Sequence, residues 1–388
     1  MTTLVRELDR KGDLAADRVA CVVGGDERTY GALAAQVRAF AGGLLELGLR
    51  PGDRVSLYLP NCADYVVCFY GAMRAGMLAN PINHVLTPRE VEYLLRDSGA
   101  SVLVTTPELG ERLSSTVEGL PGLTVITTDL RTGSDIEGAA GEAGGGALAL
   151  ADVLAGRERD LPYPDGSAPA CLPYSSGTTG RPKGIVHTHD SLSVQAVLSA
   201  NALQLRAEDV LVQALPLVHL YPGNIIMGGL IVTGGTMVVQ PVFEPGGFVD
   251  LLSKVRASAC AGVPTTYAML NRLPDQRLSG LDLGALRVAF SAGAPLPASI
   301  QHEFNERFGT APVLDIYGIT EAAGSLTCCL RYGETPERSC GVPYPRTAIR
   351  IVDAEDRDVP VGEVGELIAR GPQLMTEYWQ RPEATAST

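Results

Sequence analysis

The residues best suited to chemistry lie in one glycine- and hydroxyl-rich run, residues 174–184 (YSSGTTGRPKG). The run follows the apolar residues 170–172 and contains three glycines, four serine or threonine hydroxyls and one lysine. A loop of this kind after a strand offers backbone N–H groups, hydroxyls and a positive charge to anionic oxygens. The spacing is not that of a Walker loop, because Lys183 is followed by Gly184 and not by serine or threonine. The run therefore predicts a nucleotide-phosphate loop, with a flexible surface loop and an ordinary solvated lysine as the alternatives. The predicted phosphate ligands are Ser175, Ser176, Gly177, Thr178, Thr179, Gly180 and Lys183.

Three more segments follow in order: residues 216–221 (PLVHLY), 291–296 (SAGAPL) and 317–321 (YGITE). Together with the glycine-rich run and an opening TYGAL at residues 29–33, they resemble the motifs of the adenylate-forming (ANL) superfamily. The resemblance extends from about residue 29 to the last residue. It implies the N-terminal core of an acyl-CoA synthetase, that is, of an AMP-dependent synthetase and ligase.

The resemblance assigns roles around a bound ATP. Glu321 is the expected Mg²⁺ ligand, since a hard cation prefers oxygen donors, and Thr320 is expected to reach the α-phosphate. A carboxylate at the start of a helix is the alternative for Glu321. The implied catalytic residues are Thr320, Glu321, Lys183 and His219. The implied nucleotide contacts beyond the glycine-rich run are Gly293, Ala294, Pro295, Asp315, Ile316, Tyr317, Gly318 and Thr320, with the Tyr317 ring stacked on adenine and Asp315 accepting from its amine.

The resemblance also implies a pocket for a carboxylic acid. Relatives that take α-amino acids have an aspartate at the position of Leu220, and leucine cannot pair with an ammonium group. Ile316 stands where many relatives have glycine or alanine, so one wall is expected to be bulkier. An uncharged lining is expected, which favours an apolar acid, with His219 as a packed core histidine in the alternative. The implied pocket residues are His219, Leu220, Tyr221, Asn224, Phe290, Ala292, Ile316, Gly324 and Ser325.

The expected reaction is activation of an aryl or fatty-type acid by ATP and magnesium to acyl-AMP, followed by transfer to a thiol, with coenzyme A as the expected acceptor. One alternative is an acyl-AMP ligase that loads a carrier protein or performs only one half-reaction. An alternative of another class is a non-catalytic module that binds acyl groups or nucleotides. The intact glycine-rich run and the segment at 317–321 argue against that module.

Composition supports a large enzyme of the cytoplasm. The chain has 388 residues, 45% of them hydrophobic, which predicts more than one subdomain. A formal net charge of −13 argues against nucleic acid as a partner. The first residues do not resemble a signal peptide, and the most apolar stretch, residues 225–239, is too short to span a membrane. Eight scattered cysteines and five histidines without zinc-site spacing predict reduced thiols.

Alternating helix and strand patterns predict an α/β fold with parallel sheets covered by helices. Helices are expected at residues 30–47, 64–75 and 88–98, the last with Thr87 as N-cap, and strands at 53–59 and 101–105. The Gly/Ala-rich residues 133–149 predict an exposed loop, and short strands at 348–353 and 365–370 predict a small β-barrel subdomain. The expected division is a first α/β subdomain at 1–170, a second with the nucleotide motifs at 171–330 and the β-barrel part at 331–388.

Members of the superfamily continue past the segment at residues 378–385 into a T-G-D motif, whose aspartate holds the ribose. A C-terminal domain follows, which supplies a lysine to the adenylation step. Neither occurs in these 388 residues. The expectation is therefore an N-terminal core with the C-terminal domain absent.

Overall fold

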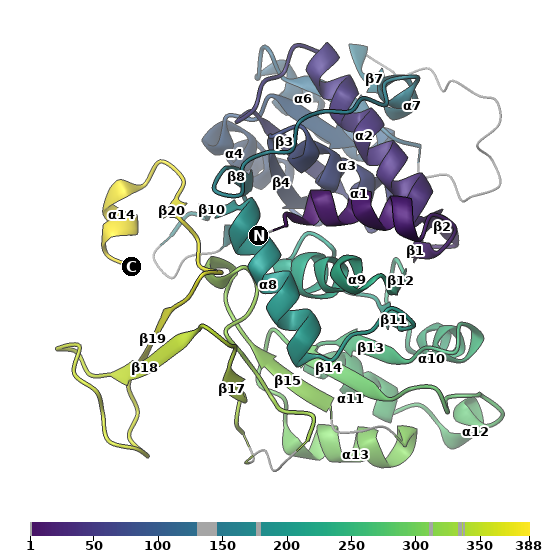
Figure 1. The fold of residues 1–388 in the computed structure, drawn as a ribbon, viewed down its shortest axis with the longest axis vertical. Helices are drawn as coiled ribbons and strands as arrows, with labels where there is room; N and C mark the ends of the chain where they lie inside the picture. The colour runs from purple at the N-terminus through teal and green to yellow at the C-terminus, as the bar shows by residue number, and fades with distance from the viewer. Residues whose placement is uncertain (1, 130–145, 176–179, 310–312, 333–335, 337) are drawn as a thin grey trace.

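A computed structural model describes residues 2–129, 146–175, 180–309, 313–332, 336 and 338–388. Two large sheets with helices packed on them make up the body, one above the other in Figure 1, and a thin hairpin projects from the side. The early part of the chain builds most of one sheet and the middle part most of the other. This arrangement confirms the predicted α/β class with two helix-covered sheets.

The first sheet has parallel strands at its centre and one edge and antiparallel strands at the other edge. The antiparallel edge is built around β10, which carries Lys183 at its start. In spatial order the strands are β20 (Glu377–Tyr378), β10 (Lys183–Thr188), β8 (Pro169–Cys171), β4 (Leu78–Asn83), β3 (Arg54–Leu59), β5 (Val102–Thr105), β6 (Thr124–Thr127) and β7 (Leu148–Ala149), and β9 (Tyr174–Ser175) also pairs with β10.

The second sheet is parallel through β14 and β15, whose carboxyl ends carry the two nucleotide motifs at residues 291–296 and 317–321. Side chains at neighbouring carboxyl ends meet at one edge of such a sheet, which is where α/β proteins bind ligands. In spatial order the strands are β17 (Val342–Pro343), β16 (Thr327–Cys328), β15 (Val313–Tyr317), β14 (Val288–Ala292), β13 (Ala259–Gly262), β11 (Val210–Gln213), β12 (Thr236–Val239), β1 (Val19–Val23) and β2 (Asp26–Thr29).

Local capping defines several helices. Thr87 and Glu90 form a complete capping box at the start of α4, and Gly99 ends that helix in the left-handed conformation. The longer helices are α1 (Leu4–Leu14), α2 (Tyr30–Glu46), α3 (Ala63–Arg74), α4 (Pro88–Ser98), α8 (His189–Ala202), α10 (Pro245–Lys254), α11 (Pro264–Asn271) and α13 (Ala298–Phe308). The shorter ones are α5 (Pro107–Glu111), α6 (Ser114–Glu118), α7 (Leu150–Leu154), α9 (Met227–Thr233), α12 (Asp275–Leu278) and α14 (Pro382–Ala386), with a π-helical turn η2 (Tyr221–Ile226) and a 3₁₀ turn η3 (Thr320–Ala322).

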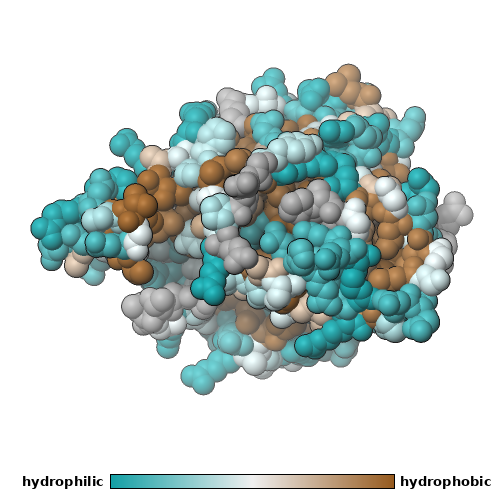
Figure 2. All heavy atoms as spheres, turned by 90° about the horizontal axis from the view of Figure 1, so that it is seen from below, coloured by the Kyte–Doolittle hydropathy of each residue, from teal (hydrophilic) through white to brown (hydrophobic). Residues whose placement is uncertain are grey.

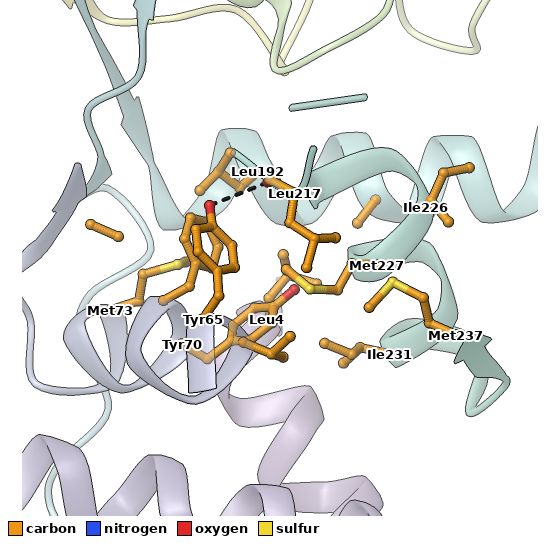
Figure 3. Packing of buried hydrophobic residues seen from close by; sticks show 14 of the residues in the cluster. Leu4, Tyr65, Tyr70, Met73, Leu192, Leu217, Ile226, Met227, Ile231 and Met237 are labelled. Carbon is orange, nitrogen blue, oxygen red and sulfur yellow. Dashed lines mark hydrogen bonds between the residues drawn. The ribbon is translucent and has the colours of Figure 1, made fainter. Parts of the chain in front are cut away.

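One hydrophobic core joins the two sheets. Figure 3 shows Tyr65 and Tyr70 of α3 and Leu4 of α1 facing Met227 of α9. The hydroxyl of Tyr65 donates to the backbone carbonyl of Leu217 at 3.2 Å, so the polar end of a buried ring is satisfied across the boundary. The shared core therefore fixes the position of one sheet relative to the other.

The expected helices at 30–47, 64–75 and 88–98 are present as α2, α3 and α4, and the strands at 53–59 and 101–105 as β3 and β5. The sheets cross the expected subdomain limits. In the second sheet β1 pairs with β12 and β2 pairs with β1, while β10 belongs to the first sheet. Most of the loop expected at 133–149 lies outside the described residues. Within the part of the chain that the structure covers, no helix is long and apolar enough to cross a membrane.

Residues beyond 330 add the small β part as a two-stranded antiparallel sheet, β18 (Ala348–Val352) and β19 (Glu366–Arg370). This hairpin projects from the body in Figures 1 and 2 and carries the exposed side chains of Ile351, Val361 and Val364. The two strands pair only with each other in the described residues, so they form an open ladder and not the closed barrel that the sequence predicts. The other strands of this segment join the large sheets.

Candidate active site

The glycine-rich run forms a hairpin. Ser175 at the end of β9 pairs with Lys183 at the start of β10, so the first and last predicted phosphate ligands face each other at its base. Ser176, Gly177, Thr178 and Thr179 lie outside the described residues. Gly180 re-enters with φ of +140°, a conformation that favours glycine. The described part of the run thus places Ser175 and Lys183 together.

Glu321 lies beside this hairpin base, although it is far away in sequence. Its Oε1 accepts a hydrogen bond from the Tyr378 hydroxyl at 2.8 Å and a longer one from the Ser175 hydroxyl at 3.5 Å. The Lys183 ammonium lies over the Tyr378 ring, 4.6 Å from its centre. Tyr378 therefore contacts the predicted metal ligand with its hydroxyl and the predicted phosphate lysine with its ring. Sequence reasoning missed it, since nothing local in the segment at 378–385 indicates this contact.

Thr320 is held through its backbone by a buried histidine. The Nε2 of His187, on β10, lies 2.8 Å from the Thr320 carbonyl oxygen, and its Nδ1 lies 3.3 Å from the Ser191 hydroxyl. Burial lowers the pKa of His187 to about 4, so the ring is neutral at pH 7. A carbonyl only accepts hydrogen bonds, which assigns the proton to Nε2. His187 is a second residue that the motifs did not indicate.

The predicted adenine side forms at the ends of β14 and β15. Gly293 has φ of +84°, which shapes the exposed turn through Ala294 and Pro295. Asp315 pairs in register with Ser291, which places it beside that turn. Its Oδ1 is buried with no hydrogen-bond partner among the described residues, and desolvation raises the pKa of this carboxyl.

A buried, unpartnered acceptor is costly unless a ligand supplies a donor. Asp315 lines a cavity of about 560 Å³, and the half-exposed ring of Tyr317 follows two residues later. The exocyclic amine of adenine is a donor of the right kind. Neither Tyr317 nor Gly293 lines that cavity, so the adenine contacts of these residues stay a prediction.

Gly318 lets the backbone pack against the turn that follows. A Cβ at this position would lie 2.2 Å from the Cα of Ser325 and 2.3 Å from the carbonyl oxygen of Gly324, both backbone atoms. Gly324 itself has φ of +112°. The backbone between β15 and η3 is therefore fixed by close contacts that only glycine permits at residue 318.

A cavity of about 610 Å³ brings the predicted acid pocket and the nucleotide motifs together. Five predicted pocket residues line it: His219, Leu220, Tyr221, Ala292 and Gly324. Gly293, Gly318 and Thr320 line the same cavity. Desolvation lowers the pKa of His219, so its ring is neutral at pH 7.

The other four predicted pocket residues do not line this cavity and support its wall from behind. The amide of Asn224 donates to the carbonyl of Ala323 at 3.2 Å, and Ser325 accepts from Gln195 at 2.8 Å. The Phe290 carbonyl accepts the hydroxyl of Tyr221 at 3.1 Å. Ile316 packs in the core and does not line the cavity, so the expected bulkier wall is not formed there.

The expectation of an uncharged lining is wrong at one position. Glu90, in the first turn of α4, lines the cavity. Its Oε2 accepts from the backbone N–H of Thr87 at 2.8 Å and from the Thr87 hydroxyl at 2.7 Å, and these bonds lower the pKa of the carboxyl. Glu90 is thus an ionised carboxylate already engaged as a helix cap.

The described residues contain no group of three or more histidine, cysteine, aspartate or glutamate side chains that would hold a metal by itself. Mg²⁺ is commonly held by one or two carboxylates together with substrate phosphates and water. Glu321, next to Ser175 and Lys183 at the base of the hairpin, fits that mode of binding. A site of this kind is completed by the nucleotide.

Fold and site together define an adenylate-forming enzyme of the ANL superfamily. A family model described as AMP-binding enzyme matches residues 8–379. A feruloyl-CoA synthase from Amycolatopsis sp is 34% identical over 379 residues, which cover 97% of this chain and 72% of the relative. A long-chain-fatty-acid–CoA ligase from Yersinia pestis is 33% identical, covering 95% and 69%. The crystal structure of an anthranilate CoA ligase in complex with anthranoyl-AMP superposes with a TM-score of 0.90 at 28% identity, covering all of this chain and 73% of that one.

The chain therefore belongs to the AMP-binding enzyme family, as an acid–thiol ligase of the acyl-CoA synthetase type.

Proposed function

We propose that the protein activates an apolar carboxylic acid with ATP to an acyl-adenylate and transfers the acyl group to coenzyme A. The observation that carries the proposal is the shared cavity: His219 and Leu220 of the acid segment line it together with Gly293 and Thr320 of the nucleotide segments. In such a cavity no protein atoms separate a bound acid from the α-phosphate of bound ATP. Relatives named as CoA ligases support the acceptor.

The preferred substrate is proposed to be a planar aryl acid and not a long fatty acid. Tyr221 is fixed by its bond to the Phe290 carbonyl, and Ile225 closes the space beside Gly324, so the cavity is bounded by rigid groups near two small residues, Ala292 and Gly324. Leu220 offers nothing to an ammonium group. Glu90 would repel a second carboxylate, which disfavours dicarboxylic acids.

Each side chain has one expected task in the adenylation step. Lys183 and Ser175 bind phosphate oxygens as fixed donors at the hairpin base. Glu321 would hold Mg²⁺, which supplies positive charge to the phosphate oxygens of bound ATP. The hydroxyl of Thr320 is expected to contact the α-phosphate, and His187 keeps its backbone in place. The neutral ring of His219 is expected to orient the acid carboxylate at the cavity mouth.

The nucleoside part is expected to be held by Asp315, Tyr317 and the turn at Gly293. Asp315 accepts the adenine amine in this proposal, which would satisfy its buried oxygen. Binding energy from these remote groups orients the α-phosphate toward the acid.

The test is calorimetry with non-hydrolysable acyl-sulfamoyl adenosines that carry cinnamoyl, benzoyl, octanoyl or phenylalanyl groups. The cinnamoyl and benzoyl compounds are expected to bind most tightly and the phenylalanyl compound most weakly. Tightest binding of the octanoyl compound would move the substrate class to fatty acids, and no binding by a folded sample would overturn the proposal.

Catalysis is tested by pyrophosphate release with hydroxylamine as an acyl-AMP trap. Coenzyme A and a phosphopantetheinylated carrier protein are then supplied separately as acceptors. A purely binding module would release no pyrophosphate with any acid.

All eight cysteines are free thiols, which supports a reducing compartment such as the cytoplasm.

A further inference from the structure

Asp97 lies in the last turn of α4, outside the predicted motifs, and its carboxylate contacts two elements next to the candidate site. Its Oδ2 accepts a hydrogen bond from the Tyr174 hydroxyl at 2.9 Å, and its Oδ1 accepts one from the Arg381 guanidinium at 2.5 Å. The Asp97 side chain is only 9% exposed, so water competes little for these bonds. One carboxylate is thus bonded to a residue of β9 and to a residue that follows β20.

The backbone of Asp97 holds the segment after β20 a second time. The indole Nε1 of Trp379 donates to the Asp97 carbonyl at 3.1 Å, and the Trp379 backbone N–H donates to the Gly184 carbonyl of β10 at 2.8 Å. A Cβ on Gly184 would lie 3.1 Å from the Cβ of Trp379 and 3.1 Å from the Cζ of Tyr174. β10 therefore passes between two residues that Asp97 bonds.

The residues held in this way adjoin the predicted phosphate and metal ligands. Tyr174 directly precedes Ser175, the first described residue of the phosphate set. On the other side, the held segment includes Tyr378, whose hydroxyl donates to Glu321 at 2.8 Å and whose ring centre lies 4.6 Å from the Lys183 ammonium. A shift of either neighbour would change the distance between the metal ligand and the phosphate lysine.

The charge of Asp97 is unfavourable for binding an anion. Asp97 and Lys183 line one cavity, of about 380 Å³, beside the acid cavity. By Coulomb's law a carboxylate at this place repels the phosphates of a nucleotide. A favourable contribution of Asp97 to nucleotide binding must therefore come from geometry, and a misplacement of about 1 Å in a catalytic constellation can cost about a hundredfold in rate.

We propose that Asp97 is a positioning residue for the adenylation step, which holds the β9–β10 hairpin against β20 and so keeps Ser175 and Lys183 at a fixed distance from Glu321. The inference deepens the proposed function and rests on it for the identity of the ligand. Asp97 touches no substrate in this role and acts only through the residues that it bonds. An ion pair that merely stabilises the fold would instead affect every ligand alike.

The experiment measures the affinities of the 388-residue protein for Mg·ATP and for AMP by calorimetry. AMP has the adenosine and the α-phosphate but not the phosphates assigned to the hairpin. Asp97→Asn keeps the shape of the side chain and removes its charge. By charge alone this change would strengthen ATP binding, whereas loss of positioning weakens it. The expected result is about a tenfold loss of affinity for ATP, with the affinity for AMP nearly unchanged.

A second variant removes one of the bonds without a change in charge. Tyr174→Phe keeps the ring and lacks the hydroxyl that Asp97 accepts, so ATP affinity is expected to fall in the same direction by a smaller factor. Asp250→Asn, in an exposed ion pair with Arg277, is the control with the same change in net charge as Asp97→Asn. Tyr332→Phe, at an exposed ring, is the control for the tyrosine. Both controls are expected to leave ATP and AMP affinities unchanged.

Each outcome decides the positioning role. An unchanged or increased ATP affinity in Asp97→Asn overturns it, and so does an equal loss of affinity for ATP and AMP, which would leave Asp97 as a stabilising residue only. Should Asp97→Asn fail to fold, Tyr174→Phe decides by the same comparison. Binding of a cinnamoyl-sulfamoyl adenosine is measured in the wild type: its absence counts against the proposed function, whereas its presence together with unaltered ATP affinity in the variants refutes the positioning role alone.

Discussion

Gly318→Ala tests whether the close backbone packing between β15 and η3 shapes the nucleotide site. The added Cβ would lie 2.2 Å from the Cα of Ser325, and real Cβ contacts are essentially never below 3.0 Å. The two backbone segments must therefore separate by about 0.8 Å. Because the obstructing atoms are backbone, no side-chain rotation relieves the contact, and overpacking of this kind costs about 1–3 kcal/mol of stability.

The same displacement predicts the effect on binding. A hydrogen bond of about 2.9 Å that lengthens by that amount is lost, and each loss costs about 1 kcal/mol for neutral partners and up to about 3 kcal/mol for charged ones. Affinity for an acyl-sulfamoyl adenosine is therefore expected to fall about tenfold to a hundredfold.

The assay combines calorimetry with urea unfolding of the wild type, Gly318→Ala and the control Gly284→Ala. A Cβ at Gly284 would meet only an Asp282 oxygen at 3.5 Å, an ordinary contact. If Gly318→Ala matched the control in both affinity and unfolding free energy, the reasoning that the loop is fixed by backbone contact would be refuted.

Three further predictions concern groups around the β9–β10 hairpin. Glu321→Gln is expected to slow pyrophosphate release by a factor that corresponds to on the order of several kcal/mol of lost transition-state stabilisation, with an unchanged circular dichroism spectrum. A near-normal rate of release would show that Glu321 does not hold the metal. Tyr378→Phe removes the hydroxyl that contacts Glu321 and retains the ring, so the Mg²⁺ concentration for half-maximal ATP binding is expected to rise about tenfold, whereas Tyr332→Phe at an exposed ring leaves it unchanged. Burial lowers the pKa of His187 to about 4 in the folded chain, whereas the unfolded chain has the ordinary value of about 6.5. Between these two pH values the unfolded chain binds one more proton than the folded chain. The free energy of unfolding is therefore expected to fall as the pH is lowered from about 6.5 to about 4. His187→Gln should reduce this loss by up to about 1.4 kcal/mol per pH unit, while the exposed His302→Gln should not; identical pH profiles would contradict the neutral buried ring.

Local sequence determined those features whose physical cause lies within a few residues. The capping box of Thr87 and Glu90 joins residues three apart, so the start of α4 is readable from the chain. The sequence also placed Ser175 and Lys183 in one short glycine-rich run, expected as a phosphate loop, and the structure pairs these two residues. The family motifs then indicated Asp315, Gly318 and Glu321 as nucleotide-site residues, in roles that stay predictions until binding is measured.

Only the tertiary structure decided which distant residues complete the site. Tyr378 meets Glu321 across 57 residues, His187 meets Thr320 across 133, and Glu90 lines the acid cavity from the start of helix α4. Such contacts depend on how β10, β15 and β20 are placed by the shared core, and no periodicity or cap in the local sequence records that placement. The same holds for the charge of the acid cavity: the motif residues alone predict an uncharged wall, and the packing of α4 against the first sheet adds a carboxylate to it.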